Sequence, residues 1–431
     1  MQANKIKNIF KSEFIRNLAV LVSGNGIGQG VSLLVYPILT RIYSEADFGV
    51  FSLFLSVTGL LCIISTGRYE ESLVVAKTRQ ETQILLGISI KLLLLCTLLL
   101  SLLAFFCGDA ILLFFRLESI SNYKYLIAPS VFFTGLAFIL SNLATRNKQF
   151  KSIASSSISM NISSSGLKLA LSKLHLAAGG FIYSNLVGQM LACVSYFRFK
   201  GDIKAALLKG QWNLEKKIGL QYKAYPSFNV SRTFISTFSW NLPFLLLTGI
   251  FGETALGLFA LTFALSFRPV NLLVDSLFNV MFQKIVSIKE HKESIMPKLI
   301  QFWKKLSLVL LPCFIIIYLV APLVFGFVFG DNWKESGVYL QMLLPWVFMT
   351  LLVKPIAFIP LVFEQQGKAL WIEIINLLLR LAAIYIGVYY ENFNLSILLF
   401  CLVGFVFLLI LLIWYVSLIR KYEQEVAKNI V

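Results

Sequence analysis

The sequence predicts an all-α protein that crosses a membrane many times. Of its 431 residues, 58% are apolar and only 14% are charged. The mean hydropathy is +0.80, which lies outside the balance of soluble globular domains. Several stretches reach the roughly 20 mostly apolar residues that a bilayer-spanning helix needs. One segment also occurs twice, about half a chain apart, which indicates two related halves.

The apolar stretches predict twelve spans, six in each half. In the first half they cover about residues 17–40, 48–66, 84–107, 125–144, 152–172 and 175–197. In the second half they cover about 226–250, 255–282, 304–329, 337–362, 370–389 and 394–418. An even number of spans returns the chain to its starting side, so the halves are expected to be parallel repeats. We therefore expect an N-terminal lobe (1–200), a basic linker (201–224), a C-terminal lobe (225–419) and a tail (420–431).

The repeated segment is LTRIYSEADFGVFSL at 39–53 and LTGIFGETALGLFAL at 247–261. The two copies align without gaps and are identical at seven of fifteen positions. Chance similarity between two apolar stretches is the alternative. Glu45 and Gly49 recur in register as Glu253 and Gly257, inside a turn-like sequence, and this favours duplication.

Basic residues are distributed unequally between the predicted loops. If the N-terminus is cytoplasmic, 27 Lys and Arg lie on that side and 5 on the other, so the positive-inside rule places both termini in the cytoplasm. This distribution also accounts for the net charge of +17 without nucleic-acid binding. The segments 5–15 and 198–223 mix basic and apolar residues, which favours amphipathic helices on anionic lipid. A site for a cytosolic partner is the alternative for the longer segment.

Charged side chains inside the predicted spans are the candidate functional residues, because each costs at least about 2.5 to 3.5 kcal/mol near the bilayer centre. A surplus of cations suits an anionic substrate such as a phosphate, which arginine binds through two oxygens. The lysines lie nearer the span ends, where they can also extend to the interface. The cations are Lys91, Lys168, Arg232, Arg268, Lys354 and Arg380, and the acids are Asp275 and Glu373.

Several of these residues lie on polar stripes. Arg268, Asn271 and Asp275 share one face of span eight, and Pro269 interrupts its backbone hydrogen bonding. Asn25 and Gln29 form a stripe on span one beside several glycines. For the span-one stripe the alternative is helix packing, and for Arg268 with Asp275 it is an internal ion pair. We expect the listed cations with Asn25, Gln29 and Asn271 to bind substrate, and Asp275 or Glu373 to couple transport to an ion.

The sequence contains no pattern typical of a cofactor, metal or nucleotide site. The six cysteines lie in or beside apolar runs without a CxxC spacing, and His175 and His291 have no catalytic or metal-spaced companion. No GxxxxGK[ST] loop occurs. We expect no cofactor, no metal and no enzymatic activity, with a proton or a sodium ion as the candidate driving ion.

The N-terminal stretch RNLAVLVSGNGIGQGVSLLVYPILTRIYSEADFGVFSLF, followed by RYEESLVV at Arg68, resembles Wzx-type polysaccharide flippases of the multidrug/oligosaccharidyl-lipid/polysaccharide exporter superfamily. The most telling positions are Pro37, Arg41, Tyr43, Phe48 and Gly49. The resemblance is strong over about the first 80 residues. It implies two six-helix lobes that form a V around a central cavity.

The resemblance also implies a function in a bacterial inner membrane. Such proteins move an undecaprenyl-pyrophosphate-linked oligosaccharide, such as an O-antigen repeat unit of lipopolysaccharide, to the periplasmic leaflet by alternating access. The expected partners are that lipid, the surrounding membrane lipids and other polysaccharide assembly proteins. A cation-driven drug exporter of the same superfamily and a membrane polymerase or ligase acting on lipid-linked sugars are the alternatives. The exporter is expected to have an acid-rich interior, and the enzyme a long outer loop.

Overall fold

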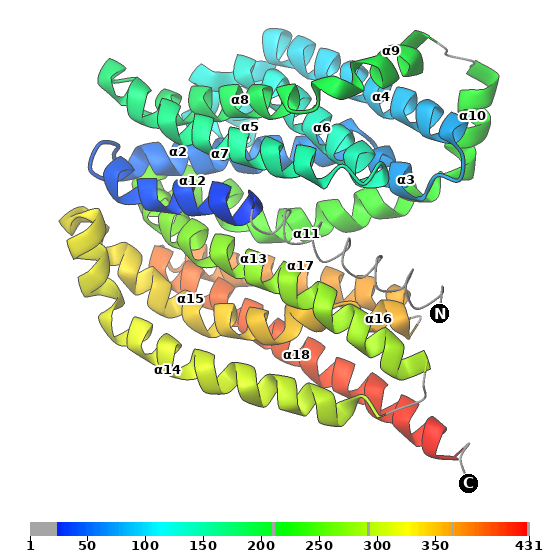
Figure 1. Cartoon of the computed structure of the whole chain (residues 1–431). Coiled ribbons are helices and arrows are strands. Elements are labelled where there is room, and N and C mark those ends of the chain that lie inside the picture. The colour runs from blue at the N-terminus through cyan, green and yellow to red at the C-terminus, as the bar shows by residue number, and fades with distance from the viewer. Residues whose placement is uncertain (1–23, 209–211, 291–293, 364, 429–431) are drawn as a thin grey trace. The chain divides into compact units, whose positions relative to one another are not determined.

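The computed structural model describes residues 24–208, 212–290, 294–363 and 365–428, and in this part of the chain the secondary structure consists of helices joined by short turns (Figure 1). Among these residues, nine helices are long and apolar enough to cross a membrane. The helix over 24–39, α7 (Phe150–Leu171) and the apolar α8 (Ala178–Val194) account for the other three predicted spans. The prediction of an all-α polytopic membrane protein is confirmed, and the first residues of span one and the segment 5–15 lie outside the described residues.

The remaining predicted spans correspond to helices in the same order. Most boundaries differ by up to five residues, but the helices of spans eight, nine and twelve extend eight to ten residues beyond the prediction at one end. In the first half these are α2 (Glu45–Ser65), α4 (Arg79–Phe106) and α6 (Lys124–Arg146). Span seven runs from Tyr225 to Phe251, and the later spans are α13 (Glu253–Glu290), α14 (Met296–Phe329), α15 (Lys334–Val353) with α16 (Ile359–Val362), α17 (Gln366–Tyr389) and α18 (Phe393–Lys428). Short elements connect them: α3 (Tyr69–Val75), α5 (Gly108–Phe114), η1 (Glu118–Tyr123), η2 (Ser172–Leu174), η3 (Phe197–Phe199), η6 (Asp331–Trp333) and η7 (Lys354–Ile356).

Span seven is the least regular of these helices. It begins with the π-helical segment η4 (Tyr225–Asn229), continues as α11 (Val230–Leu242), passes through a second π segment, η5 (Pro243–Leu247), and ends as α12 (Thr248–Phe251). Each π segment contains a proline near its start, Pro226 or Pro243. Proline lacks the N–H that the regular hydrogen-bond pattern requires, so these are the positions where the pattern changes.

The two copies of the repeated segment contact each other reciprocally at the starts of α2 and α13. A side chain on Gly49 would meet the backbone of Glu253, and one on Gly257 would meet the backbone of Glu45. Equivalent residues also have equivalent burial, since Leu39 and Leu247 are buried whereas Ile42 and Ile250 are exposed. This exchange of contacts is the geometry that a duplicated unit produces about a local twofold axis.

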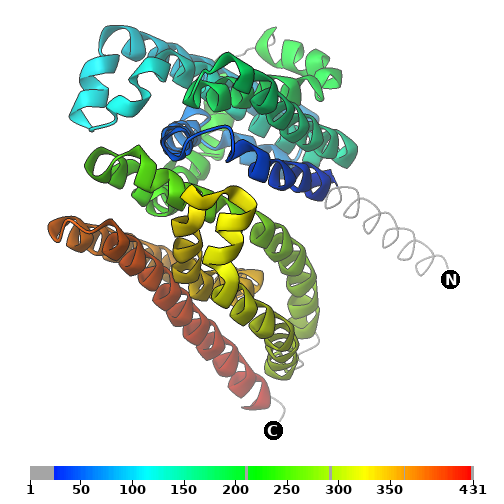
Figure 2. The same cartoon turned by 90° about the vertical axis from the view of Figure 1, so that its left-hand side faces the viewer.

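The chain divides into two compact units, 1–257 and 258–431. In the first unit α7 packs along α8 and α4 along α6 (Figure 1). In the second, α17 packs along α18 and α14 along α15 (Figure 2). The boundary lies after the one expected from the sequence at 224/225, because span seven packs against α2. The assignment of six spans to each lobe stays a prediction.

The basic linker forms two short helices, α9 (Lys200–Leu208) and α10 (Trp212–Gln221), which pack against α4. Ala206 and Ile218 are buried in a core cluster with residues of α4 and α6, whereas Lys204, Lys216 and Lys217 are exposed. The linker is therefore amphipathic and docked on the first unit, while its contact with lipid stays a prediction.

Candidate functional site

The polar stripe on span one contacts the serine-rich span five. The Ser32 hydroxyl donates to Asn161 Oδ1 at 3.0 Å and lies 3.3 Å from the hydroxyl of Ser165. A side chain on Gly28 would meet Asn161. Asn25 and Gln29, which we predicted to bind substrate, are half-buried on the same helix. The contacts of Ser32 and Gly28 are packing contacts between two helices, and substrate binding by Asn25 and Gln29 stays a prediction.

The two predicted lysines of the first unit lie in different surroundings. Lys91 on α4 forms an ion pair with Glu215 on α10, with 2.7 Å between Nζ and Oε1, so it connects a span to the linker. Lys168 on α7 places its ammonium group 5.3 Å from the ring centre of Phe51 and 5.5 Å from that of Phe181. Cation–π contacts of this kind stabilise a partly desolvated lysine.

The predicted stripe on span eight lies on one uninterrupted helix. α13 contains Pro269 within its length and continues on both sides of it. Arg268 is half-buried, whereas Asn271 and Asp275 are exposed. Arg232, on α11 of the first unit, is also exposed.

The charged residues of the later spans form a cluster within the second unit. The side chains of Asp275, Glu373 and Arg380 all lie within electrostatic range of the Lys354 ammonium group. They come from α13, α17 and η7, which the sequence places far apart. The structure brings together these four predicted residues, with two cations and two acids.

Arg380 has the most enclosed position in this cluster. Its side chain is 1% exposed, and its guanidinium carbon lies 4.7 Å from the ring centres of both Trp346 and Phe400. Planar guanidinium groups stack well on aromatic rings. Arg380 is therefore packed between the aromatic side chains of α15 and α18, in contrast to Arg268.

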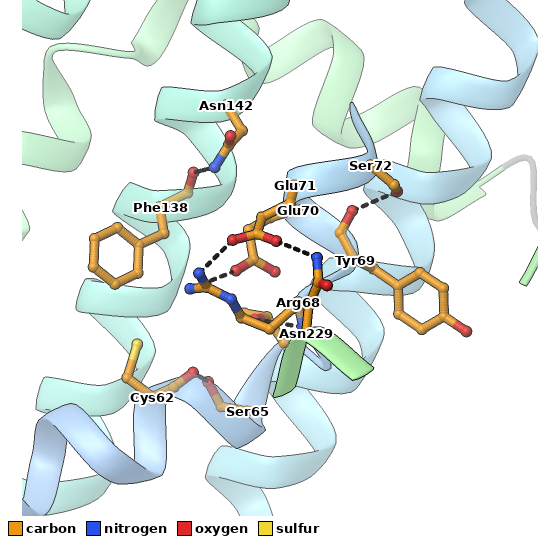
Figure 3. Close-up of polar contacts among 11 residues, drawn as sticks. Cys62, Ser65, Arg68, Tyr69, Glu70, Glu71, Ser72, Phe138, Asn142 and Asn229 are labelled. Carbon is orange, nitrogen blue, oxygen red and sulfur yellow. Dashed lines mark hydrogen bonds and ion pairs between the residues drawn. The ribbon is translucent and has the colours of Figure 1, made fainter. Parts of the chain in front are cut away.

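A second charged cluster lies in the first unit, where α2 is followed by α3. Gly67 and Arg68 both have left-handed backbones, with φ of 57° and 55°, and this turn places the Arg68 side chain beside the first turn of α3. The guanidinium bonds Glu71, and its Nη1 lies 3.6 Å from Glu70 Oε1. Figure 3 shows the guanidinium facing both carboxylates.

The two acids of this cluster have different environments. Glu71 is partly exposed and accepts a hydrogen bond from Asn229 Nδ2 at 2.9 Å, which connects α3 to η4 at the start of span seven (Figure 3). Glu70 is 1% exposed, and its Oε2 has no hydrogen-bond partner among the described residues. Burial raises the pKa of the Glu70 carboxyl, and Thr66 and Arg68 offset this only in part.

Sequence reasoning treated Arg68 and Glu70 only as loop charges within a family signature. The available signal was the order of the residues, with a glycine at the end of a span and then three charges within four positions. Such a run usually forms a solvated surface. Burial of Glu70 depends on helices from distant parts of the chain, so the sequence alone does not indicate it.

In the described part of the chain, no group of three or more His, Cys, Asp or Glu side chains is placed to hold a metal ion. The six cysteines are free, with Cys62 and Cys401 buried and Cys107 and Cys313 exposed.

Comparison with known proteins identifies both a family and a fold. The polysaccharide biosynthesis protein family matches residues 38–338. An inward-facing multidrug resistance MATE family transporter of the MOP superfamily is similar in structure, with 14% identity, a TM-score of 0.65 and coverage of 95% of this chain and 99% of that chain. The lipid II flippase MurJ in an inward closed conformation has 14% identity, a TM-score of 0.67 and coverage of 94% and 90%. No curated protein matches the sequence.

Proposed function

This chain belongs to the polysaccharide biosynthesis protein family, and from that premise we propose that it is a flippase for a lipid-linked oligosaccharide. The cargo would be an undecaprenyl-pyrophosphate-linked repeat unit of O-antigen or a related polysaccharide, moved from the cytoplasmic to the periplasmic leaflet by alternating access. The chain would lie in a bacterial inner membrane with both termini cytoplasmic, would bind no nucleic acid and would act with other polysaccharide assembly proteins.

The observation that carries this proposal is Arg268, a half-buried cation within the membrane-spanning helix α13. A pyrophosphate carries charge that must be balanced wherever it leaves water, and an arginine placed at that depth provides two donors for two phosphate oxygens. Arg232, exposed on α11, would provide a second cation.

The other predicted residues would contribute to transport in different ways. Lys168 and Lys354 would supply further positive charge, together with the amides of Asn25, Gln29 and Asn271. Asp275 and Glu373 would be candidates for coupling to a proton or a sodium ion. Lys91 and Arg380 contribute less directly in the described geometry, because one pairs with Glu215 and the other packs between aromatic rings.

Deletion of the gene tests the proposal. Loss of a flippase should cause lipid-linked, unpolymerised repeat units to accumulate on the cytoplasmic leaflet, and the intact gene should reverse this. Accumulation on the periplasmic leaflet would instead indicate a polymerase or ligase. Unchanged polysaccharide together with drug sensitivity would favour the exporter alternative, for which the likeness to MATE structures, at 14% identity, is evidence of fold alone.

A further inference from the structure

Glu70 is the buried acid that the proposed transport mechanism leaves unused. Its side chain is enclosed in the first unit, where α3 packs against α4, α6 and η4. One carboxyl oxygen faces Arg68 at 3.6 Å, and the other has no hydrogen-bond partner among the described residues. An enclosed carboxyl group in this situation is most stable when it carries a proton.

The charge balance of the cluster leads to the same conclusion. Arg68 is the cation that faces the carboxylates of both Glu70 and Glu71, so the group has an excess negative charge when both acids are ionised. Glu71 is partly exposed and has two donors, Arg68 and Asn229. Glu71 is therefore the acid that keeps its charge, and Glu70 is the acid that takes up a proton.

We propose that Glu70 is a proton-binding site of this transporter, and that its proton controls the connection between α3 and the start of span seven at Asn229. With Glu70 protonated, Arg68 stays with Glu71, and Glu71 holds Asn229. When Glu70 releases its proton to water at the exposed edge of the cluster, its carboxylate competes for Arg68. Glu71 then loses its fixed position, and the bond to Asn229 weakens.

The segment held by this bond is suited to move. Asn229 is the last residue of the π segment η4, where the helical hydrogen-bond pattern is already irregular. Further along the same span, Ser56 donates to Asn241 at 2.9 Å and keeps α11 on α2. Release at Asn229 would thus free the beginning of span seven while its middle stays attached.

Two further charged residues near α3, Arg146 and Glu81, form hydrogen bonds with groups other than Glu70 and Glu71. Arg146 on α6 donates to the carbonyl oxygens of Leu73 and Ala76 at the end of α3. At the start of α4, Glu81 accepts from the backbone of Lys77 and from Tyr222. The Cys62 thiol on α2 interacts with Glu70, and the Tyr225 hydroxyl on η4 interacts with Glu71. Thiols and phenols are ordinarily uncharged at neutral pH.

Infrared difference spectroscopy of the purified full-length protein tests the proton site without any assumption about transport. The unmodified protein should show a protonated-carboxyl band that persists above the pH at which an ordinary glutamate ionises and is lost as the pH rises further. Glu70→Gln should remove this band, and Glu71→Gln, the matched control, should keep it. An unchanged band in Glu70→Gln would overturn the proposal.

Hydrogen exchange measured by mass spectrometry tests the connection to span seven. The exchange rate of the amides at 225–231, divided by the intrinsic chemical exchange rate at the same pH, should increase as the pH rises in the unmodified protein. This increase should be absent in Glu70→Gln, and Asn229→Ala should exchange rapidly at every pH. The unmodified protein alone is decisive if Glu70→Gln is not produced, because pH-independent exchange there would contradict the proposal.

The consequence for transport rests on the proposed function and needs its own measurement. In cells or vesicles with an imposed proton gradient, Glu70→Gln should lose the acceleration that the gradient produces and keep slow, gradient-independent transport. The infrared band and the pH dependence of hydrogen exchange can respond to Glu70→Gln as expected even if the unmodified protein transports no lipid-linked oligosaccharide. That outcome would refute the proposed cargo and leave the proton site supported. Full gradient dependence in Glu70→Gln would remove Glu70 from coupling.

Discussion

Charged side chains within the spans occupy two kinds of environment, and this difference separates structural from functional candidates. Arg380 is 1% exposed between two aromatic rings, whereas Arg268 is half-buried on its helix. A guanidinium packed between rings contributes volume and cation–π stabilisation to its unit. The substrate-binding role proposed for Arg268 requires its half-buried guanidinium to bind an anion.

Substitution of these arginines should give opposite results. Arg380→Ala should lower membrane abundance, because it leaves a cavity that costs about 3 kcal/mol, and Arg380→Met should retain most of the abundance. Arg268→Ala should leave abundance unchanged and abolish polysaccharide export, while Arg268→Lys should recover part of the export because it keeps charge without the bidentate geometry. Immunoblots of membranes and assays of surface polysaccharide measure both effects.

Two results would reverse these assignments. Abundant Arg380→Ala protein without export would move Arg380 into the substrate site. Low abundance of Arg268→Ala that is restored, together with export, by adding Asp275→Asn would show that Arg268 serves an internal ion pair.

At the scale of helices, the contact between the two copies of the repeated segment accounts for the glycine that each copy contains. Gly49 on α2 and Gly257 on α13 each face the backbone of the other copy, so neither position has room for a Cβ atom. Gly59 lies on the same helix as Gly49 but has no heavy atom within 4 Å of its Cβ position. Gly49 and Gly59 therefore provide a test position and a control position on the same helix.

Substitution of these glycines by alanine should distinguish two effects on stability: the loss of a close contact between helices, and the gain from the higher helix propensity of alanine. Gly49→Ala and Gly257→Ala should each destabilise the protein by about 1 to 3 kcal/mol, because the added methyl group pushes two backbones apart. Gly59→Ala should be neutral or slightly stabilising, since alanine is the better helix former. Thermal stability of the three purified variants in one detergent provides the comparison, and equal stability of all three would contradict the contact.

At the scale of the whole molecule, nine of the described helices are long and apolar enough to cross a membrane, and the helix over 24–39, α7 and α8 correspond to the other three predicted spans. The linker helices α9 and α10 belong to the first unit, held there by the Lys91–Glu215 ion pair and by buried apolar residues. Lys204, Lys216 and Lys217 of these helices are exposed.

Topology reporters test the orientation proposed for this arrangement. A reporter placed after Val431 or within 201–210 should be cytoplasmic, and one near Asp331 should be periplasmic, because basic loops are retained on the cytoplasmic side. A periplasmic signal from 201–210 would refute the twelve-span topology.

The sequence by itself determined the spans, the duplication and the candidate charges, because apolar length and residue spacing are local properties. The boundaries of α6 and α17, for example, differ from the predicted spans by only a few residues. The same reasoning listed Arg268 and Arg380 together as candidate substrate-binding cations, and it singled out Arg268 by its polar stripe and the adjacent Pro269.

Only the tertiary structure showed that Arg380 packs between aromatic rings and revealed the acid cluster at Glu70. Trp346 and Phe400 come from different helices than Arg380, and Asn229 reaches Glu71 across 158 positions of sequence. Such contacts depend on how helices pack at long sequence separation, which no local period encodes. Whether a charged side chain is enclosed, paired or open to a substrate is therefore decided by the neighbours that folding brings to it.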